Sequence, residues 1–213
     1  MRPALILVLM FIGTPVPALA DDPKTGSESP PVYRQLFQFL NVENAGSSIS
    51  VSYYTPTQAH RDIDVTAVDF SRGWTLLGVF EVQRRVGLFH AQGTRTDAPF
   101  GVDPDSTATG ISAGVAARLY PLDLIRTSRV RPFVEGSAQF LYTPGTRDGF
   151  PSGGSGVNGF ERAGAGIVVQ LGRRLALEAT YQWYSHVSNG AGLTPQNPMW
   201  NGHGGTIGVR RLF

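Results

Sequence analysis

The sequence contains no cysteine, so neither disulfide bonds nor cysteine-ligated metal sites can stabilise this chain. Its formal net charge is only +2 over 213 residues, and no block of basic residues stands out, which argues against a nucleic-acid partner. Beyond the N-terminal segment, no apolar run approaches the roughly 20 residues that a membrane-spanning helix needs. If such a chain is secreted, its fold must be stabilised without disulfide bonds, either by a large hydrophobic core or by a lipid bilayer.

The N-terminal segment has the order of a secretory signal peptide. Arg2 supplies a positive charge, residues 4–12 are apolar, and Ala18-Leu19-Ala20 forms a small-residue cleavage site before Asp21. We therefore expect residues 1–20 to be removed, and the alternative is a buried N-terminal helix. Residues 21–45 read as a leader, in which 32–41 is either a short amphipathic helix or an irregular segment.

From about residue 46 onward, apolar and polar residues alternate with period two, which predicts β-strands. In the third segment, for example, Phe80 and Val82 alternate with Glu81 and Gln83. Eight such segments follow one another, at about 47–55, 60–71, 76–91, 108–120, 130–142, 158–171, 174–188 and 201–213. The abundance of glycine, 26 residues, and aromatics at 10% suit strands that are apolar on one face only.

The connections between the predicted strands alternate in length. Short turns are expected at 72–75 and 172–173, and long links at 92–107 and 143–157. The link 121–129 is longer than this rule predicts, and the link 55–59 is shorter. An even number of strands with short turns on one side is typical of outer-membrane proteins. The predicted fold class is therefore all-β, an eight-stranded antiparallel transmembrane β-barrel over residues 46–213.

The polar faces of these strands carry charges of both signs. In a membrane barrel they would face a narrow lumen and have to pair with one another, whereas a soluble, lipocalin-like periplasmic barrel would turn them to solvent. Small residues on the polar faces and a final strand ending at Phe213 favour the membrane barrel. The charged residues are Glu81, Arg85, Arg118, Glu135, Arg162 and Glu178.

The seventh segment ends in His186-Val-Ser188-Asn189, which has catalytic residue types at a suggestive spacing. Residues i and i+2 of a strand share a face, about 6.5–7 Å apart. A histidine beside a serine can take its proton and make the hydroxyl a nucleophile, and an amide can stabilise the oxyanion that forms. The non-catalytic alternative is a strand that ends in a polar turn, because Ser-Asn-Gly is a common turn sequence.

Three segments carry a resemblance to a known family: 130–136, 158–166, and 186–189 with Gly192, Leu193, Pro195 and Asn197. Over residues 129–213 the chain resembles the PagL-type lipid A 3-O-deacylases, also called acyloxyacyl hydrolases. The resemblance implies an outer-membrane enzyme that removes the ester-linked 3-hydroxyacyl chain at position 3 of lipid A.

The same resemblance implies roles for individual residues. Ser188 is the implied nucleophile, His186 the general base, and Asn189 with Gly192 the implied contacts to oxyanion and substrate. The family places a glutamate at the start of the last strand to orient the histidine, and this sequence has Asn201 there. Asparagine can accept a hydrogen bond from the imidazole but carries no negative charge. His203, two residues later on the same face, is a weaker substitute.

A lipid A substrate lies outside the barrel wall, so His186 and Ser188 should face lipid. Strict alternation from Leu175 to Trp183 would instead point both residues into the lumen. We therefore predict a β-bulge near Tyr184–Ser185 that shifts the alternation by one residue.

The expected partners are lipopolysaccharide and the outer membrane, with a homodimer left open. No cofactor or metal is expected, because His60, His90, His186 and His203 are dispersed. Two alternatives stay open: a catalytically inactive outer-membrane barrel and a periplasmic lipid-binding barrel.

Overall fold

The computed structural model describes residues 40–58, 61–96, 103–124, 129–143, 156–189 and 199–213. The predicted signal peptide and nearly all of the predicted leader lie outside these ranges. Among the described residues, no helix has both the length and the apolar character required to cross a membrane.

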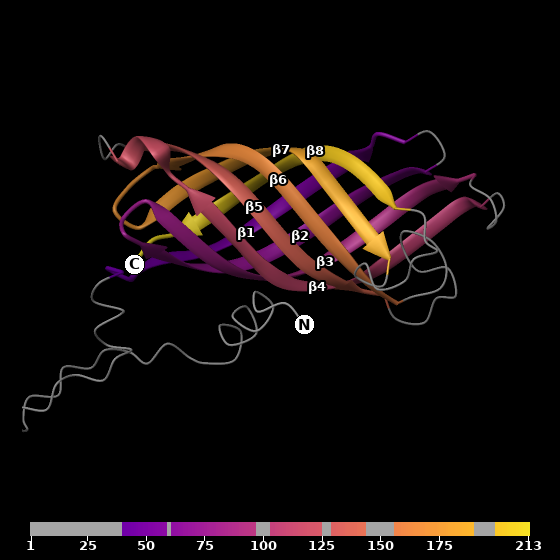
Figure 1. Cartoon of the computed structure of the whole chain (residues 1–213), viewed down its shortest axis with the longest axis horizontal. Helices are drawn as coiled ribbons and strands as arrows, with labels where there is room; N and C mark the ends of the chain where they lie inside the picture. The colour runs from indigo at the N-terminus through magenta and orange to yellow at the C-terminus, as the bar shows by residue number, and fades with distance from the viewer. Residues whose placement is uncertain (1–39, 59–60, 97–102, 125–128, 144–155, 190–198) are drawn as a thin grey trace, which may run out of the picture. The chain divides into compact units, whose positions relative to one another are not determined.

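Eight antiparallel strands form a closed barrel in which each strand pairs with the next and β1 pairs with β8 (Figure 1). Closure leaves no unpaired strand edge, and the predicted fold class is confirmed. The strands are β1 (Glu43–Pro56), β2 (Arg61–Leu76), β3 (Phe80–Arg95), β4 (Asp103–Leu119), β5 (Val130–Tyr142), β6 (Val157–Gln170), β7 (Leu175–Asn189) and β8 (Trp200–Arg211), with one 3₁₀ turn, η1 (Pro121–Leu124), after β4.

The turn between β2 and β3 lies at residues 77–79, so its prediction at 72–75 was wrong. Leu77 and Gly78 both have positive φ, 53° and 74°, as a tight turn requires. Arg72-Gly73 looked like a turn, but Gly73 serves another purpose inside the strand. A Cβ at Gly73 would lie 2.5 Å from Glu81 Oε1, so the glycine makes room for this buried carboxylate.

The outer surface of the barrel is apolar along all eight strands. A surface of this kind is unfavourable in water and suits contact with lipid. Side chains that share this exposed position include Ile49, Val51, Phe70, Val86, Leu88, Ile111, Val134, Phe140, Ile167, Leu177, Ile207 and Val209.

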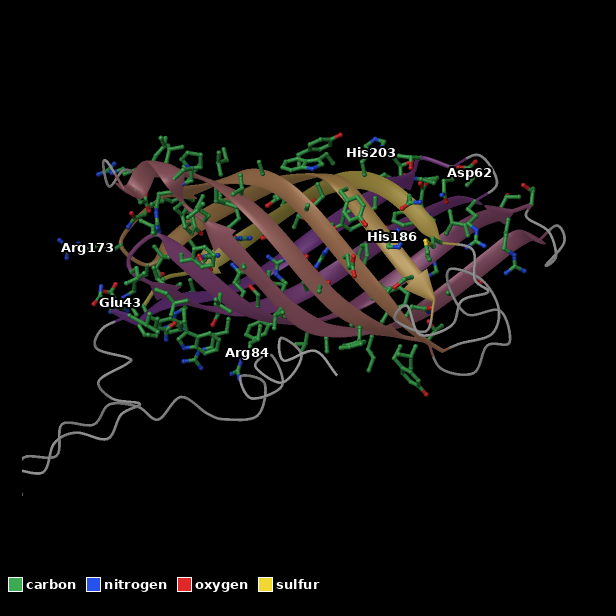
Figure 2. All side chains as sticks on the ribbon, viewed as in Figure 1. Glu43, Asp62, Arg84, Arg173, His186 and His203 are labelled. Carbon is green, nitrogen blue, oxygen red and sulfur yellow. The ribbon has the colours of Figure 1, made fainter. Side chains whose placement is uncertain are left out.

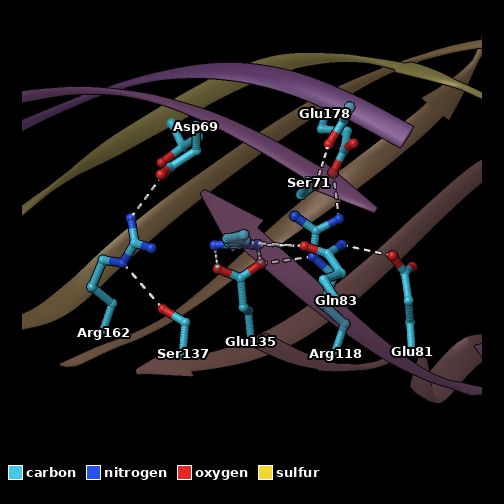
Figure 3. Close-up of polar contacts among 12 residues, drawn as sticks. Asp69, Ser71, Glu81, Gln83, Arg118, Glu135, Ser137, Arg162 and Glu178 are labelled. Carbon is cyan, nitrogen blue, oxygen red and sulfur yellow. Dashed lines mark hydrogen bonds and ion pairs between the residues drawn. The ribbon is translucent and has the colours of Figure 1, made fainter. Parts of the chain in front are cut away.

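The predicted charges are buried in the lumen and pair there (Figure 3). Glu135 accepts hydrogen bonds from Arg85 Nη1 and Nη2, at 3.0 and 2.5 Å, and from Arg118 Nε at 2.7 Å. Arg118 also donates to Glu178. Arg162 lies 3.4 Å from Asp69. The predicted lumenal pairing is therefore confirmed.

Arg210 extends this network, although the sequence pattern did not single it out. Its Nε donates to Glu178 at 2.7 Å and its Nη1 donates to Glu81 at 2.9 Å. Tyr120 also donates to Glu81, at 2.6 Å. Each of these carboxylates therefore has an arginine partner, which offsets the cost of burying its charge.

Beyond this network the interior holds an apolar cluster, together with the buried side chains of Arg61, Arg95 and Asn158. Ile63, Val65 and Ala67 of β2 point inward, while Asp62 and Thr66 of the same strand are exposed. The apolar face of β2 is thus lumenal at this end. These β2 residues pack in an interior cluster whose other members include Tyr54, Phe89, Leu141, Phe160, Val187 and Trp200.

Candidate active site

A β-bulge interrupts β7 just before the candidate catalytic residues. Tyr184 pairs with Ala163 of β6 and Gln182 pairs with Gly164, so Trp183 is an extra residue on β7. The pairing with β8 also shifts between Gln182 and Ser185. Trp183 and Tyr184 are both exposed, 54% and 43%, although they are adjacent in sequence. The bulge was predicted at Tyr184–Ser185 and lies one residue earlier.

The bulge turns His186 and Ser188 to the outer surface. Before it, Glu178 and Gln182 are buried; after it, Ser185 and Val187 are buried. His186 and Ser188 are half-buried on the opposite, outer face. Figure 2 shows His186 nearer the end of the barrel that carries Asp62 than the end that carries Glu43 and Arg173. The predicted outward orientation of the two residues is therefore confirmed.

Asn201 holds the imidazole of His186. The side chains come from paired positions on β7 and β8, and His186 Nδ1 lies 2.6 Å from Asn201 Oδ1. An amide oxygen only accepts hydrogen bonds, so this contact requires the proton on Nδ1. The neutral ring then has its lone pair on Nε2, which is the form a general base needs.

The start of β8 is fixed by contacts on both sides of Asn201. Trp200 is fully buried and its Nε1 donates to the carbonyl of Ile63 at 2.9 Å. A Cβ at Gly202 would lie 2.3 Å from the Trp200 indole, so glycine leaves the space that the ring needs. The Asn201 carbonyl accepts a hydrogen bond from the Thr57 amide at 2.9 Å. These contacts position the Asn201 amide for His186.

Ser188 lies two residues beyond His186 and opposite Gly159 of β6. The glycine leaves the serine uncovered on that side. Within the described part of the chain, no hydrogen bond joins Ser188 to His186. His186 and Ser188 therefore lie on the same outward face of β7 but do not form a hydrogen-bonded pair. Hydrogen bonds between catalytic residues are often long before substrate binds.

Glu161 is a neighbour of His186 that the sequence analysis missed. It is the β6 partner of His186, and it is exposed on the outer face. Directly paired strand residues have Cβ atoms about 4.5–5.5 Å apart. A signal was present in the sequence, because Glu161 is in phase with Ala163 and Ile167 and so places a charge on an apolar face. Glu161, His186 and Asn201 therefore form one row across three strands.

Two aromatic contacts border this row. The Tyr184 ring stacks on His186, with centroids 6.0 Å apart and an interplanar angle of 15°. His203 packs edge-on against Tyr181, with centroids 6.3 Å apart. Asn201 is therefore the residue that orients the His186 ring, whereas His203 contacts the Tyr181 ring. Gly192 and the Asn189 side chain lie outside the described residues.

A groove of about 630 Å³ runs over the outer surface of β6, β7, β8 and β1. Its floor is Gly205, where an added Cβ would meet only the Thr180 carbonyl oxygen, at 3.6 Å. Tyr53 and Tyr181 border the groove, and Tyr181 also contacts His203. The groove is therefore apolar and is linked to the catalytic candidates along β7 and β8. Its other outward-facing lining residues are Val51, Ile167, Ala179 and Ile207.

Comparison with solved structures supports the fold. The crystal structure of the outer membrane enzyme PagL matches with a TM-score of 0.54 at 17% identity, covering 76% of this chain and 97% of that one. The N-terminal β-barrel domain of Pseudomonas aeruginosa OprF matches with a TM-score of 0.45 at 13% identity, covering 80% of this chain and 100% of that one. No family model and no curated protein matches the chain. The likeness to PagL therefore supports the eight-stranded barrel fold.

Proposed function

We propose that the protein is an outer-membrane serine esterase that removes the ester-linked 3-hydroxyacyl chain at position 3 of lipid A. The observation that carries the proposal is the bulge at Trp183–Tyr184, which turns His186 and Ser188 to the lipid-facing surface. A site in this position meets its substrate in the outer leaflet of the membrane. The apolar groove over Gly205 offers space for an acyl chain beside it. The fold likeness to the outer membrane enzyme PagL agrees with this assignment.

The proposed reaction has two steps. Ser188 Oγ attacks the ester carbonyl carbon while His186 Nε2 takes the hydroxyl proton. The ester C–O bond breaks, and the sugar 3-oxygen leaves with that proton. Water then attacks the acyl-serine with His186 again as base, releasing the 3-hydroxy fatty acid and restoring Ser188.

The remaining residues have supporting roles in this scheme. Asn201 keeps the His186 proton on Nδ1, and Asn189 and Gly192 are assigned to the developing oxyanion. Glu161 supplies a nearby negative charge that favours the imidazolium formed in each step. This charge partly replaces the one that Asn201 lacks.

An alkyl fluorophosphonate tests the nucleophile directly, because it reacts with activated serines. Incubation of the folded protein with this reagent, followed by peptide mass spectrometry, should place the adduct on Ser188. Ser185→Ala is a matched control, since Ser185 is buried on the lumenal side and its Oγ has no partner among the described residues. Absence of any Ser188 adduct in folded protein would count against the esterase.

The second candidate is a catalytically inactive outer-membrane barrel. The specific observation in its favour is the neutral Asn201 as the partner of His186, together with the missing hydrogen bond between the described Ser188 and His186 side chains. Replacing the acid by an amide costs about 10⁴-fold in rate in one serine protease. Under this reading, neither the fluorophosphonate nor lipid A would react.

A further inference from the structure

A second feature of the outer surface lies away from the candidate active site. Arg72 of β2 and Arg84 of β3 are directly paired across the two strands. Both lie on the outer face, where the next residues along the strands are Phe70 and Val86, each 53% exposed. The guanidinium carbons of Arg72 and Arg84 lie 5.9 and 5.3 Å from the ring centroid of Trp74.

The two arginines lack a counter-charge among the described residues. The carboxylates of the lumenal network pair with other arginines, and no described acid forms an ion pair with Arg72 or Arg84. Moreover, Arg72 Nε is buried and has no hydrogen-bond partner in the described part of the protein. Like charges directly opposite each other destabilise a sheet, and an unpaired buried donor adds to that cost. An anion bound by both guanidinium groups would offset the repulsion between the two arginines.

The position of the pair along the barrel indicates the source of the anion. Arg72 and Arg84 flank the turn at residues 77–79, whose exposed side chains include Leu77. Figure 2 shows Arg84 nearer the end that carries Glu43 and Arg173 than the end that carries Asp62. Short turns mark the periplasmic side of outer-membrane barrels. The arginines therefore lie in the periplasmic half of the barrel, from which their long side chains can reach the headgroups of the periplasmic leaflet.

We propose that Arg72, Arg84 and Trp74 form a binding site for the phosphate of an anionic phospholipid in the periplasmic leaflet. Guanidinium groups bind phosphate oxygens through paired, charge-assisted hydrogen bonds. An indole at headgroup level packs beside such a lipid, as tryptophan does at membrane interfaces. The acyl chains would lie over the exposed Phe70 and Val86 side chains. This inference does not depend on the proposed esterase activity.

Native mass spectrometry of the full chain in neutral detergent tests the site. The probes are dioleoyl phosphatidylglycerol and, as the net-neutral comparison with the same chains, dioleoyl phosphatidylcholine. The double variant Arg72→Gln/Arg84→Gln should bind phosphatidylglycerol about tenfold more weakly, with phosphatidylcholine binding unchanged. The control Arg173→Gln removes an exposed arginine from the 171–174 turn at the same end and should bind like wild type.

Three results would overturn the proposal. Unchanged phosphatidylglycerol binding by the double variant would show that the arginines do not bind the lipid. An equal loss of both lipids would show that the arginines do not select an anionic lipid, because phosphatidylcholine carries the same phosphodiester. Displacement of the lipid by millimolar inorganic phosphate would identify a site for free phosphate. If the glutamine variant does not fold, Arg72→Lys/Arg84→Lys keeps both charges but not the paired hydrogen bonds, and should still weaken phosphatidylglycerol binding severalfold.

Discussion

Asn201 Oδ1 lies 2.6 Å from Nδ1 of His186, across the β7–β8 pair, and this contact fixes which nitrogen of the imidazole faces outward as a base. The neutral amide orients the imidazole but does not provide the negative charge that an aspartate or glutamate would. Orientation and charge can therefore be separated by changing one residue.

Substitutions at Asn201 should move the rate in opposite directions. Asn201→Asp adds the negative charge that stabilises the imidazolium and should raise kcat by at least about tenfold, given the cost of the reverse change elsewhere. Asn201→Leu removes the acceptor and should lower kcat below wild type. Release of 3-hydroxy fatty acid from purified lipid A measures both rates. Equal rates for all three proteins would exclude Asn201 from the mechanism.

Inserting one alanine between Tyr184 and Ser185 should abolish activity without unfolding the barrel. The insertion shifts the residues after the bulge by one position, so that His186 and Ser188 move to the lumenal phase of β7. Trp183→Ala keeps the bulge and is the matched control, with activity expected within about threefold of wild type, as for most surface substitutions. Folding of both variants is checked by resistance of the barrel to unfolding in detergent at room temperature. An active, folded insertion variant would contradict the role of the bulge.

Removal of the Glu161 charge should slow the reaction modestly. A paired charge on an exposed sheet face contributes about 0.2–1 kcal/mol, so Glu161→Gln should lower kcat by up to about fivefold. Glu161→Asp keeps the charge and should retain more activity than the glutamine variant. Identical kcat values for the two variants would leave Glu161 without a role in the mechanism.

Filling the groove should impair long-chain substrates selectively. At Gly205 an added side chain has room outside the barrel wall, so Gly205→Leu should fold and block the groove. Activity on lipid A should fall at least about tenfold, while hydrolysis of a short acetyl ester should change little. Gly136 is a matched control, because it is exposed on β5 and a Cβ there meets nothing within 4 Å. Equal effects of Gly205→Leu on both substrates would argue against an acyl-chain groove.

Breaking the lumenal network should destabilise the barrel. Glu135→Ala leaves Arg85 and Arg118 without the carboxylate that both contact. Removing one partner of a buried ion pair costs about 3–5 kcal/mol. Urea unfolding in lipid vesicles measures this loss as a lower transition midpoint. A midpoint unchanged from wild type would mean that the pairing does not stabilise the fold.

Much of the fold was predictable because alternation along a strand is a local property. The outward positions of Ile49 and Val51 and the inward position of Glu135 follow from period two alone. The inward Ile63 and Val65 did not follow, because part of the interior is lined by an apolar cluster and the local sequence does not report which strand faces meet there. The turn at residues 77–79 was misplaced because Gly73 looked like a turn residue, whereas packing against Glu81 requires it.

The candidate site was predictable in part for similar reasons. His186 and Ser188 stand in one short motif, and Asn201 was assigned by the family resemblance. The bulge was predicted because strict alternation along the strand would have turned a lipid-facing site into the lumen. The bulge was predicted one residue too late, because nothing in the sequence marks Trp183 and Tyr184 as neighbours that both face outward. Glu161 lies on another strand, so its place beside His186 depends on register and not on spacing.

The most direct test of the central claim is mass spectrometry of lipid A from Gram-negative cells that express the wild-type chain or Ser188→Ala. Both proteins must be present and folded in the outer membrane. The proposed esterase predicts lipid A that lacks one 3-hydroxyacyl chain only in cells with the wild-type protein. Identical, fully acylated lipid A in both strains would contradict it.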